Sequence, residues 1–178
     1  MKTQRIFLVA ALACATTLFA APPDAPVARV EVNFDHPENF TDVRDSLTGT
    51  EKGRDGYLSE FKEFLQQRAP RYLAAGQTLT ISFTDIDMAG DFEPWRGPNS
   101  SDIRIVKDIY PPRLNFSYKL VDASGVVLKE GQEKLVDLSF QMSASPINNG
   151  DSLHYEKAML NNWLHDKIQP PKAASTKK

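Results

Sequence analysis

Residues 78–88, TLTISFTDIDM, contain the pattern that decides the fold. Apolar side chains first alternate with Thr and Ser, as in a half-buried β-strand, and then change from odd to even positions. The apolar positions are Leu79, Ile81, Phe83, Ile86 and Met88. A one-residue slip moves every later side chain to the opposite face of a sheet. Either a β-bulge therefore lies near Thr84 and Asp85, or Asp85 and Asp87 point toward the core.

Similar patterns on both sides of this strand predict a mixed domain. Alternation predicts further strands over 28–34, from Ile103 to just before Pro111, over 114–120 and from Val126 onward, with a hairpin turn at 122–125. Apolar residues at helical spacing predict helices at 57–67 and 153–168, the first capped by Asp55. The order β-α-β-β-β-β-α predicts an α+β layer. We expect a largely antiparallel sheet of about five strands with two helices packed on one face.

The N-terminal segment has the features of an export signal. Lys2 and Arg5 precede an apolar run from Ile6 to Phe19, and Ala20 offers a small residue for cleavage. The run is short for a hydrocarbon layer of about 30 Å, and no second long apolar stretch follows, so we expect no integral membrane segment after cleavage. We therefore expect a periplasmic protein with a signal peptide at 1–20, cleaved after Ala20, a linker at 21–26, one domain at 27–169 and a disordered basic tail at 170–178.

Composition excludes several kinds of chemistry. The only cysteine, Cys14, lies in the expected signal, so the exported chain would have no disulfide and no cysteine nucleophile. With 21 Lys and Arg against 23 Asp and Glu, the chain lacks the basic surplus of a nucleic acid binder. Its three histidines offer no zinc ligand pattern, and it contains neither a phosphate-binding glycine motif nor a Gly-x-Ser-x-Gly elbow. We predict no nucleic acid partner and no cofactor, with a divalent metal as the alternative.

An acidic turn after residue 84 is the candidate metal site. Asp85, Asp87 and Gly90 match a calcium-binding EF-hand loop, but Ala89 and Arg96 stand at two ligand positions, which excludes a true EF-hand. A looser acidic site remains as a hypothesis. It would use Asp85, Asp87, Asp91 and Glu93, with Asp35 or Asp42 from the end of the first strand. The alternative is that these side chains are simply solvated, as charged loop residues usually are.

Residues 91–98, DFEPWRGP, place two aromatic side chains and an arginine in a segment that we expect to be exposed. Trp and Arg are enriched among the residues that dominate binding energy. Phe92, Trp95 and Arg96 are therefore the preferred contact residues for a partner. The alternative is that Phe92 and Trp95 fold back and cover a sheet edge.

Four short segments resemble, in sequence and in order, the bacterial envelope family catalogued as domain of unknown function 3016. They are Glu38-Asn39-Phe40-Thr41-Asp42, Asp85-Ile86-Asp87-Met88-Ala89-Gly90, Asp102-Ile103-Arg104, and Tyr155-Glu156-Lys157-Ala158-Met159-Leu160 with Trp163. The resemblance covers about residues 28–168. It implies a location in a Gram-negative envelope, and it supplies no activity, substrate or catalytic residue.

These observations favour a non-enzymatic binding or envelope-associated module. Its expected binding residues are Asn39, Asp42, Asp85, Asp87, Phe92, Trp95 and Arg96. The expected partner is an envelope protein or polymer. One alternative is a metal-assisted hydrolase of envelope material, with Asp85 and Asp87 as metal ligands. The other is a structural subunit that assembles through a sheet edge.

Overall fold

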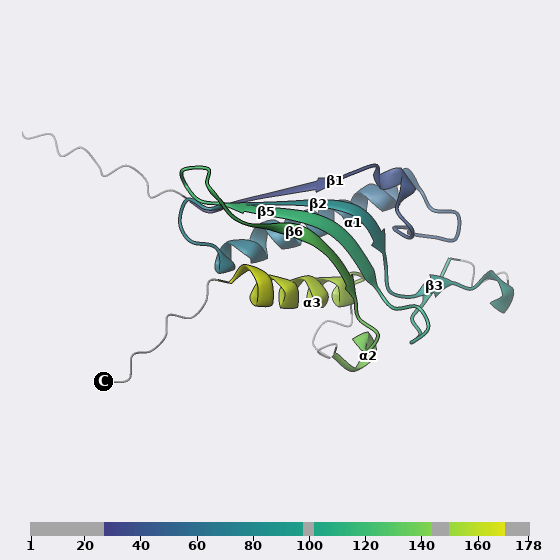
Figure 1. Ribbon diagram of the computed structural model, residues 1–178. Helices are drawn as coiled ribbons and strands as arrows, with labels where there is room; N and C mark the ends of the chain where they lie inside the picture. The colour runs from purple at the N-terminus through teal and green to yellow at the C-terminus, as the bar shows by residue number, and fades with distance from the viewer. Residues whose placement is uncertain (1–26, 98–101, 144–149, 170–178) are drawn as a thin grey trace, which may run out of the picture.

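A four-stranded sheet with helices on one face forms the body of the protein (Figure 1). The computed structural model describes residues 27–97, 102–143 and 150–169, so the expected signal peptide, linker and basic tail lie outside the described residues. The strand order is β1-β2-β5-β6. The strands are β1 (Arg29–Phe34), β2 (Thr78–Asp87), β5 (Arg113–Val121) and β6 (Val127–Val136). Only the β1–β2 pair is parallel, which confirms a largely antiparallel α+β architecture.

Two main helices cover one face of this sheet. Helix α1 (Glu51–Arg68) connects β1 to β2, and α3 (His154–Trp163) follows β6 and continues into a π-helical turn, η5 (Leu164–Ile168). Their apolar stripes form a core with the sheet, which includes Phe61, Leu65, Phe83, Phe116, Leu160 and Trp163. The Trp163 ring meets Phe116 edge to face, with ring centroids 4.8 Å apart. Shorter helical turns are η1 (Pro37–Asn39), η2 (Ala69–Tyr72), η3 (Pro94–Arg96) and α2 (Phe140–Ser143).

The first helix begins earlier than the apolar pattern predicted. Thr50, and not Asp55, is its N-cap, because the Thr50 hydroxyl accepts a hydrogen bond of 2.9 Å from the backbone N–H of Gly53. The first turn is polar and carries no core side chain, so hydrophobic periodicity did not reveal it.

The strand expected from Ile103 to just before Pro111 is shorter than predicted and is not part of the main sheet. Strand β4 (Arg104–Ile105) pairs with β3 (Asp91–Phe92) in a separate two-stranded ribbon, which extends beyond the end of the main sheet (Figure 1). The main sheet thus has four strands and not about five. Gly90 turns the chain out of β2 with a φ of 82°, and a Cβ there would lie 2.8 Å from the carbonyl oxygen of Ile105.

A β-bulge in β2 explains the change of apolar positions. The register with β5 shifts between Phe83 and Asp85, so Thr84 is the additional residue. Beyond it, Ile86 and Met88 are buried in the core. Asp85 and Asp87 consequently lie on the opposite face of the sheet, and the bulge interpretation is confirmed.

Candidate functional site

Segments that are far apart in the sequence meet where β2 ends and β5 begins, which we call the loop end of the sheet. Asp42 forms an isolated parallel bridge with Asp87. In this bridge the Asp42 N–H donates to the Ile86 carbonyl, and the Met88 N–H donates to the Asp42 carbonyl, each at 3.0 Å. The bridge thereby places the segment at 38–42 beside the segment at 85–90.

Arg104 links the β3–β4 ribbon to this bridge through hydrogen bonds. Its two terminal nitrogens donate to the two carboxylate oxygens of Asp42 at 2.8 and 3.0 Å, and both also donate to backbone carbonyls, those of Gly90 and Arg44, at 2.9 Å. The guanidinium also lies 4.7 Å from the centroid of the buried Phe92 ring. A two-pronged Arg–carboxylate contact fixes direction as well as distance, so this pair sets the position of the ribbon.

Asp42 is an ionised group held inside the protein. Its residue is 4% exposed, and Arg44 adds a third hydrogen bond of 2.9 Å to its carboxylate. Burial on its own would raise the pKa of Asp42, but the hydrogen bonds from Arg104 and Arg44 outweigh this effect and lower that pKa below its ordinary value. The carboxylate therefore stays charged and paired, as a structural anchor requires.

A small hollow of about 260 Å³ opens at the loop end. Its charged lining consists of three aspartates and two arginines, which are Asp42, Asp87, Asp91, Arg44 and Arg113. Arg44 bridges Asp42 and Asp91, the latter at 3.3 Å, and Arg113 donates to Asp87 at 2.7 Å. Each lining aspartate thus has an arginine as a partner.

The two aspartates of the predicted metal site have separate partners. Asp85 accepts hydrogen bonds from the backbone N–H and the hydroxyl of Thr41, at 2.7 and 3.0 Å. Asp87 accepts from Arg113, and its partial burial raises its pKa even though Arg113 opposes the shift. Within the described ranges, no group of three or more His, Cys, Asp or Glu side chains could hold a metal ion.

Glu156 connects helix α3 to the same end of the sheet. Its side chain is fully buried, and one carboxylate oxygen accepts a hydrogen bond of 2.7 Å from the Ala89 N–H, while the other oxygen has no partner. Burial raises the pKa of Glu156, although the bond from Ala89 acts in the opposite direction. A protonated carboxyl group can accept the Ala89 bond without placing a charge in the core.

The ribbon has a second anchor around Glu93. This residue is 1% exposed, and its carboxylate binds Lys107, Arg96 and the Tyr110 hydroxyl. The hydrogen bond from Lys107 is the main cause that lowers the pKa of Glu93. Trp95 lies between Glu93 and Arg96 in the chain, and it is 72% exposed, whereas Phe92 is buried. The predicted aromatic pair is therefore divided: Phe92 supports the ribbon, and Trp95 faces solvent.

The remaining predicted residues lie around the same end. Asn39 is exposed at the end of η1, and Arg96 lies beside Glu93. Reasoning from sequence did not select Arg44, Arg104, Lys107, Tyr110 and Glu156 as site residues. Arg104 and Glu156 occur in the segments that carry the family resemblance, which was the available signal. The pairing of Lys107 and Tyr110 with Glu93 depends on the folded ribbon.

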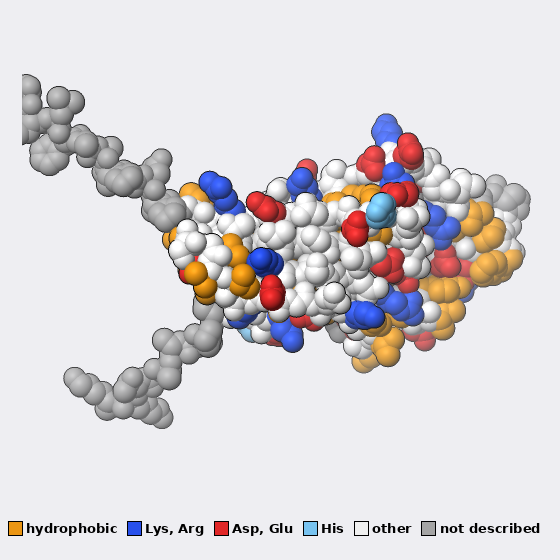
Figure 2. Space-filling model, turned by 45° about the horizontal axis from the view of Figure 1, so that its top comes forward, with side chains coloured by type: hydrophobic (Ala, Val, Ile, Leu, Met, Phe, Trp, Pro, Cys, Tyr) orange, Lys and Arg blue, Asp and Glu red, His pale blue; other side chains and the backbone are white. Residues whose placement is uncertain are grey.

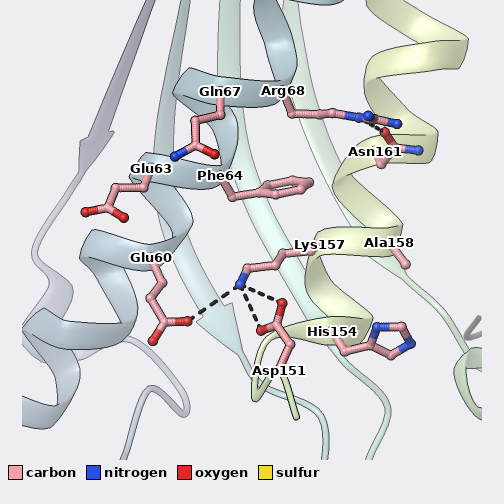
Figure 3. Close-up of a pocket in the computed structure, with 10 residues that line it drawn as sticks. All are labelled: Glu60, Glu63, Phe64, Gln67, Arg68, Asp151, His154, Lys157, Ala158 and Asn161. Carbon is pink, nitrogen blue, oxygen red and sulfur yellow. Dashed lines mark hydrogen bonds and ion pairs between the residues drawn. The ribbon is translucent and has the colours of Figure 1, made fainter. Parts of the chain in front are cut away.

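A larger hollow of about 550 Å³ lies between α1 and α3 (Figure 3). Lys157 reaches both oxygens of Asp151 at 2.8 Å and lies 3.5 Å from Glu60. At the other end, Arg68 donates to the side-chain oxygen of Asn161 at 2.6 Å. The cations that line this hollow are thus bound to partners on both helices or next to them, and we interpret these contacts as bracing the helix layer.

Comparison with known proteins identifies the family. The model of a family described as "Protein of unknown function (DUF3016)" matches residues 28–166. The chain belongs to this family. No curated protein matches the sequence of this DUF3016 member.

Among solved structures, the protein is similar to two PelC dodecamers from Paraburkholderia phytofirmans. One is 12% identical with a TM-score of 0.38, over 79% of this chain and 83% of that one. The other is 14% identical with a TM-score of 0.38, over 85% of this chain and 95% of that one. Similarity at this level carries no argument about the function of the DUF3016 protein.

Proposed function

We propose that this DUF3016 protein is an exported, envelope-associated binding module that contacts an envelope protein through Trp95 and catalyses no reaction. The observation that carries the proposal is the placement of Trp95, 72% exposed, on a ribbon that is anchored on both sides. An exposed large aromatic side chain on a fixed support is typical of a binding hot spot.

The surroundings of Trp95 support a protein as the partner. Ile103 and Ile109, from the same β3–β5 connection, are 53% and 65% exposed. Clusters of exposed apolar side chains on an otherwise polar surface commonly mark protein contact sites. Aliphatic side chains match the apolar surface of a protein better than that of a hydrated polymer.

Rigidity of the ribbon supports binding without a large ordering cost. Arg104 and Glu93 hold its two sides through charged hydrogen bonds, and Phe92 packs under the Arg104 guanidinium. A preorganised contact loses less conformational entropy on association than a mobile loop does.

The charged groups at the loop end support a binding role over a catalytic one. Asp42 pairs with Arg104, Asp87 with Arg113, and Glu93 with Lys107. A general base or metal ligand needs a lone pair directed at a substrate or a metal, and each of these carboxylates has at least one oxygen bound to a neighbouring cation instead.

Trp95 can be tested by site-directed crosslinking in cells. A photo-crosslinking amino acid at position 95 should form adducts with a specific envelope protein, and the same amino acid at the exposed helix position Lys62 should not. Trp95→Ala should abolish co-purification of that protein and leave the melting temperature within about 1 °C, because the side chain contributes little to the core. Equal adducts at both positions would contradict the proposal.

Export can be tested separately. The protein recovered from the periplasmic fraction should begin at Ala21, after removal of residues 1–20. An intact Met1 in the cytoplasmic fraction would contradict the envelope location and leave the Trp95 contact to be judged on its own.

A further inference from the structure

The exposed large apolar side chains of this protein gather at the two ends of the sheet. Among the described residues, those at the loop end are Trp95, Ile103, Val106, Ile109, Val136, Leu138 and Met142, and those at the opposite end are Val27, Val126, Val127 and Leu128. In the view of Figure 2, hydrophobic side chains likewise cluster toward both ends, and the surface between them is mainly polar.

Strand register explains this placement. Arg29, Thr78, Val121 and Val127 are aligned across the sheet at one end, which we call the hairpin end because the β5–β6 turn lies there. Asp87, Arg113 and Val136 are aligned at the loop end. The two apolar patches are therefore separated by the length of the strands.

The patch at the hairpin end is held in a defined shape. Asp122 accepts hydrogen bonds from the Ser124 and Val126 N–H groups at 2.8 and 3.0 Å, which closes the turn. A register shift between Leu120 and Val121 follows at the start of β6. The apolar residues Val126, Val127 and Leu128, 58%, 42% and 46% exposed, thus stand on a closed turn and a bulged strand.

The two ends also carry opposite charge. The connections at the loop end, 35–50 and 88–112, contain eight Asp and Glu residues and four Lys and Arg residues. The hairpin end carries Arg29, Arg71, Lys129 and Lys167 against Asp122 and Asp166. Opposite charge around two apolar patches favours contact between unlike ends and disfavours contact between like ends.

We propose that the loop end of one molecule binds the hairpin end of a second copy, so that the protein assembles head to tail. The contact places Trp95 against the patch formed by Val126 and Leu128. This inference rests on the proposed function in naming a partner for Trp95. Such a contact is heterologous: a pair of molecules joined in this way retains one free loop end and one free hairpin end, so that assembly continues beyond a dimer.

Sedimentation velocity on the purified exported protein, over a range of concentrations, tests this assembly. Wild type should form species larger than a dimer. Trp95→Lys, which sets a positive charge against the basic hairpin end, and Leu128→Glu, which sets a negative charge against the acidic loop end, should each weaken self-association at least about tenfold. Lys62→Glu, on the exposed face of α1, is the matched control and should behave as wild type. Far-ultraviolet circular dichroism should show that all variants are folded.

A mixing experiment separates the head-to-tail contact from other arrangements. Trp95→Lys retains an intact hairpin end and Leu128→Glu an intact loop end, so an equimolar mixture should form a one-to-one dimer and nothing larger. If Leu128→Glu self-associates like wild type, or if the mixture stays monomeric while wild type assembles, the head-to-tail contact is wrong.

Failure of this inference is distinguishable from failure of the proposed function. Wild type that remains a monomer at millimolar concentration would overturn self-assembly. Crosslinks from position 95 to a different envelope protein would then still support the proposed function, whereas the absence of any specific adduct would overturn both.

Discussion

At the scale of single residues, the pairing of Asp42 with Arg104 is the contact on which the loop end depends. Both oxygens of the buried carboxylate are bound by one guanidinium, which also donates to the carbonyls of Gly90 and Arg44. Removal of one partner from such a pair leaves an uncompensated charge in a buried place.

We predict that Arg104→Ala lowers the free energy of unfolding by about 3 to 5 kcal/mol, because Asp42 then remains buried with only Arg44 as a cationic partner. Arg104→Lys should recover only part of this loss, because an ammonium group cannot make the two-pronged contact. Urea unfolding monitored by circular dichroism measures both variants. Equal stability of Arg104→Ala and wild type would show that the pair is not an anchor.

Glu156 gives a prediction about pH. Burial raises the pKa of Glu156 in the folded state, so the folded protein retains a proton that the unfolded chain releases at its ordinary pKa. Its contribution to the free energy of unfolding should therefore fall as the pH rises from the unfolded pKa toward the folded pKa. Glu156→Gln has no such proton to lose, so it should gain stability relative to wild type as the pH rises above the ordinary pKa of a glutamate.

Urea titrations of wild type and Glu156→Gln at several pH values provide this comparison. Asp87 has a raised pKa in both proteins, so its contribution cancels in the difference. A stability difference that does not change with pH would show that Glu156 is ionised in the folded protein.

At the scale of elements, the β-bulge at Thr84 determines which face of the sheet the acidic side chains occupy. Thr84 is accommodated as a bulge in β2, and this single step keeps Ile86 in the core and Asp85 on the opposite face. The same step lets Asp85 accept the two hydrogen bonds from Thr41, which link the end of β2 to the segment after β1.

We predict that the protein still folds when Thr84 is deleted. Asp85 then follows Phe83 directly and keeps its register with Asn115, so Ile86 and Met88 still face the core and both aspartates still face away from it. Thr84→Ala is the control, because it keeps the backbone of the bulge and loses only a hydrogen bond of 3.3 Å to the Asn115 carbonyl. Circular dichroism and urea unfolding measure both variants. A deletion variant that is unfolded while Thr84→Ala is folded would refute this account of β2.

At the scale of the whole molecule, the sheet has a braced helical face and two ends with different surfaces. No helix among the described residues is long and apolar enough to cross a membrane. In the hollow between α1 and α3, Lys157 forms ion pairs with Glu60 and Asp151. The exposed apolar side chains lie at the loop end and the hairpin end. The ends of the molecule are accordingly the surfaces at which we propose contact with another protein.

We predict that calcium, magnesium, manganese and zinc ions do not raise the melting temperature, because the carboxylates at the loop end are bound to separate partners. A metal present at 100 times its dissociation constant would add about 2.7 kcal/mol, or several degrees in a domain of this size. Differential scanning fluorimetry with chelator and then with each ion makes the measurement. An increase that Asp87→Asn abolishes would instead support the metal site considered from sequence.

Sequence by itself determined the class of fold, the location of both main helices and the change of face in β2. These features follow from local periodicity, which depends on residues that are neighbours in the chain. The family assignment also followed from sequence, through short segments whose order was recognisable.

Only the tertiary structure decided that those segments meet and which of their side chains pair. The joining of Asp42 to Arg104 crosses 62 residues, and that of Ala89 to Glu156 crosses 67. The tertiary structure also decided that Arg104–Ile105 pairs with Asp91–Phe92 in a separate ribbon. It left Phe92 buried and Trp95 exposed. The physical reason is that burial and ion pairing depend on which distant segments fill the space around a side chain, whereas periodicity reports only the face on which that side chain lies.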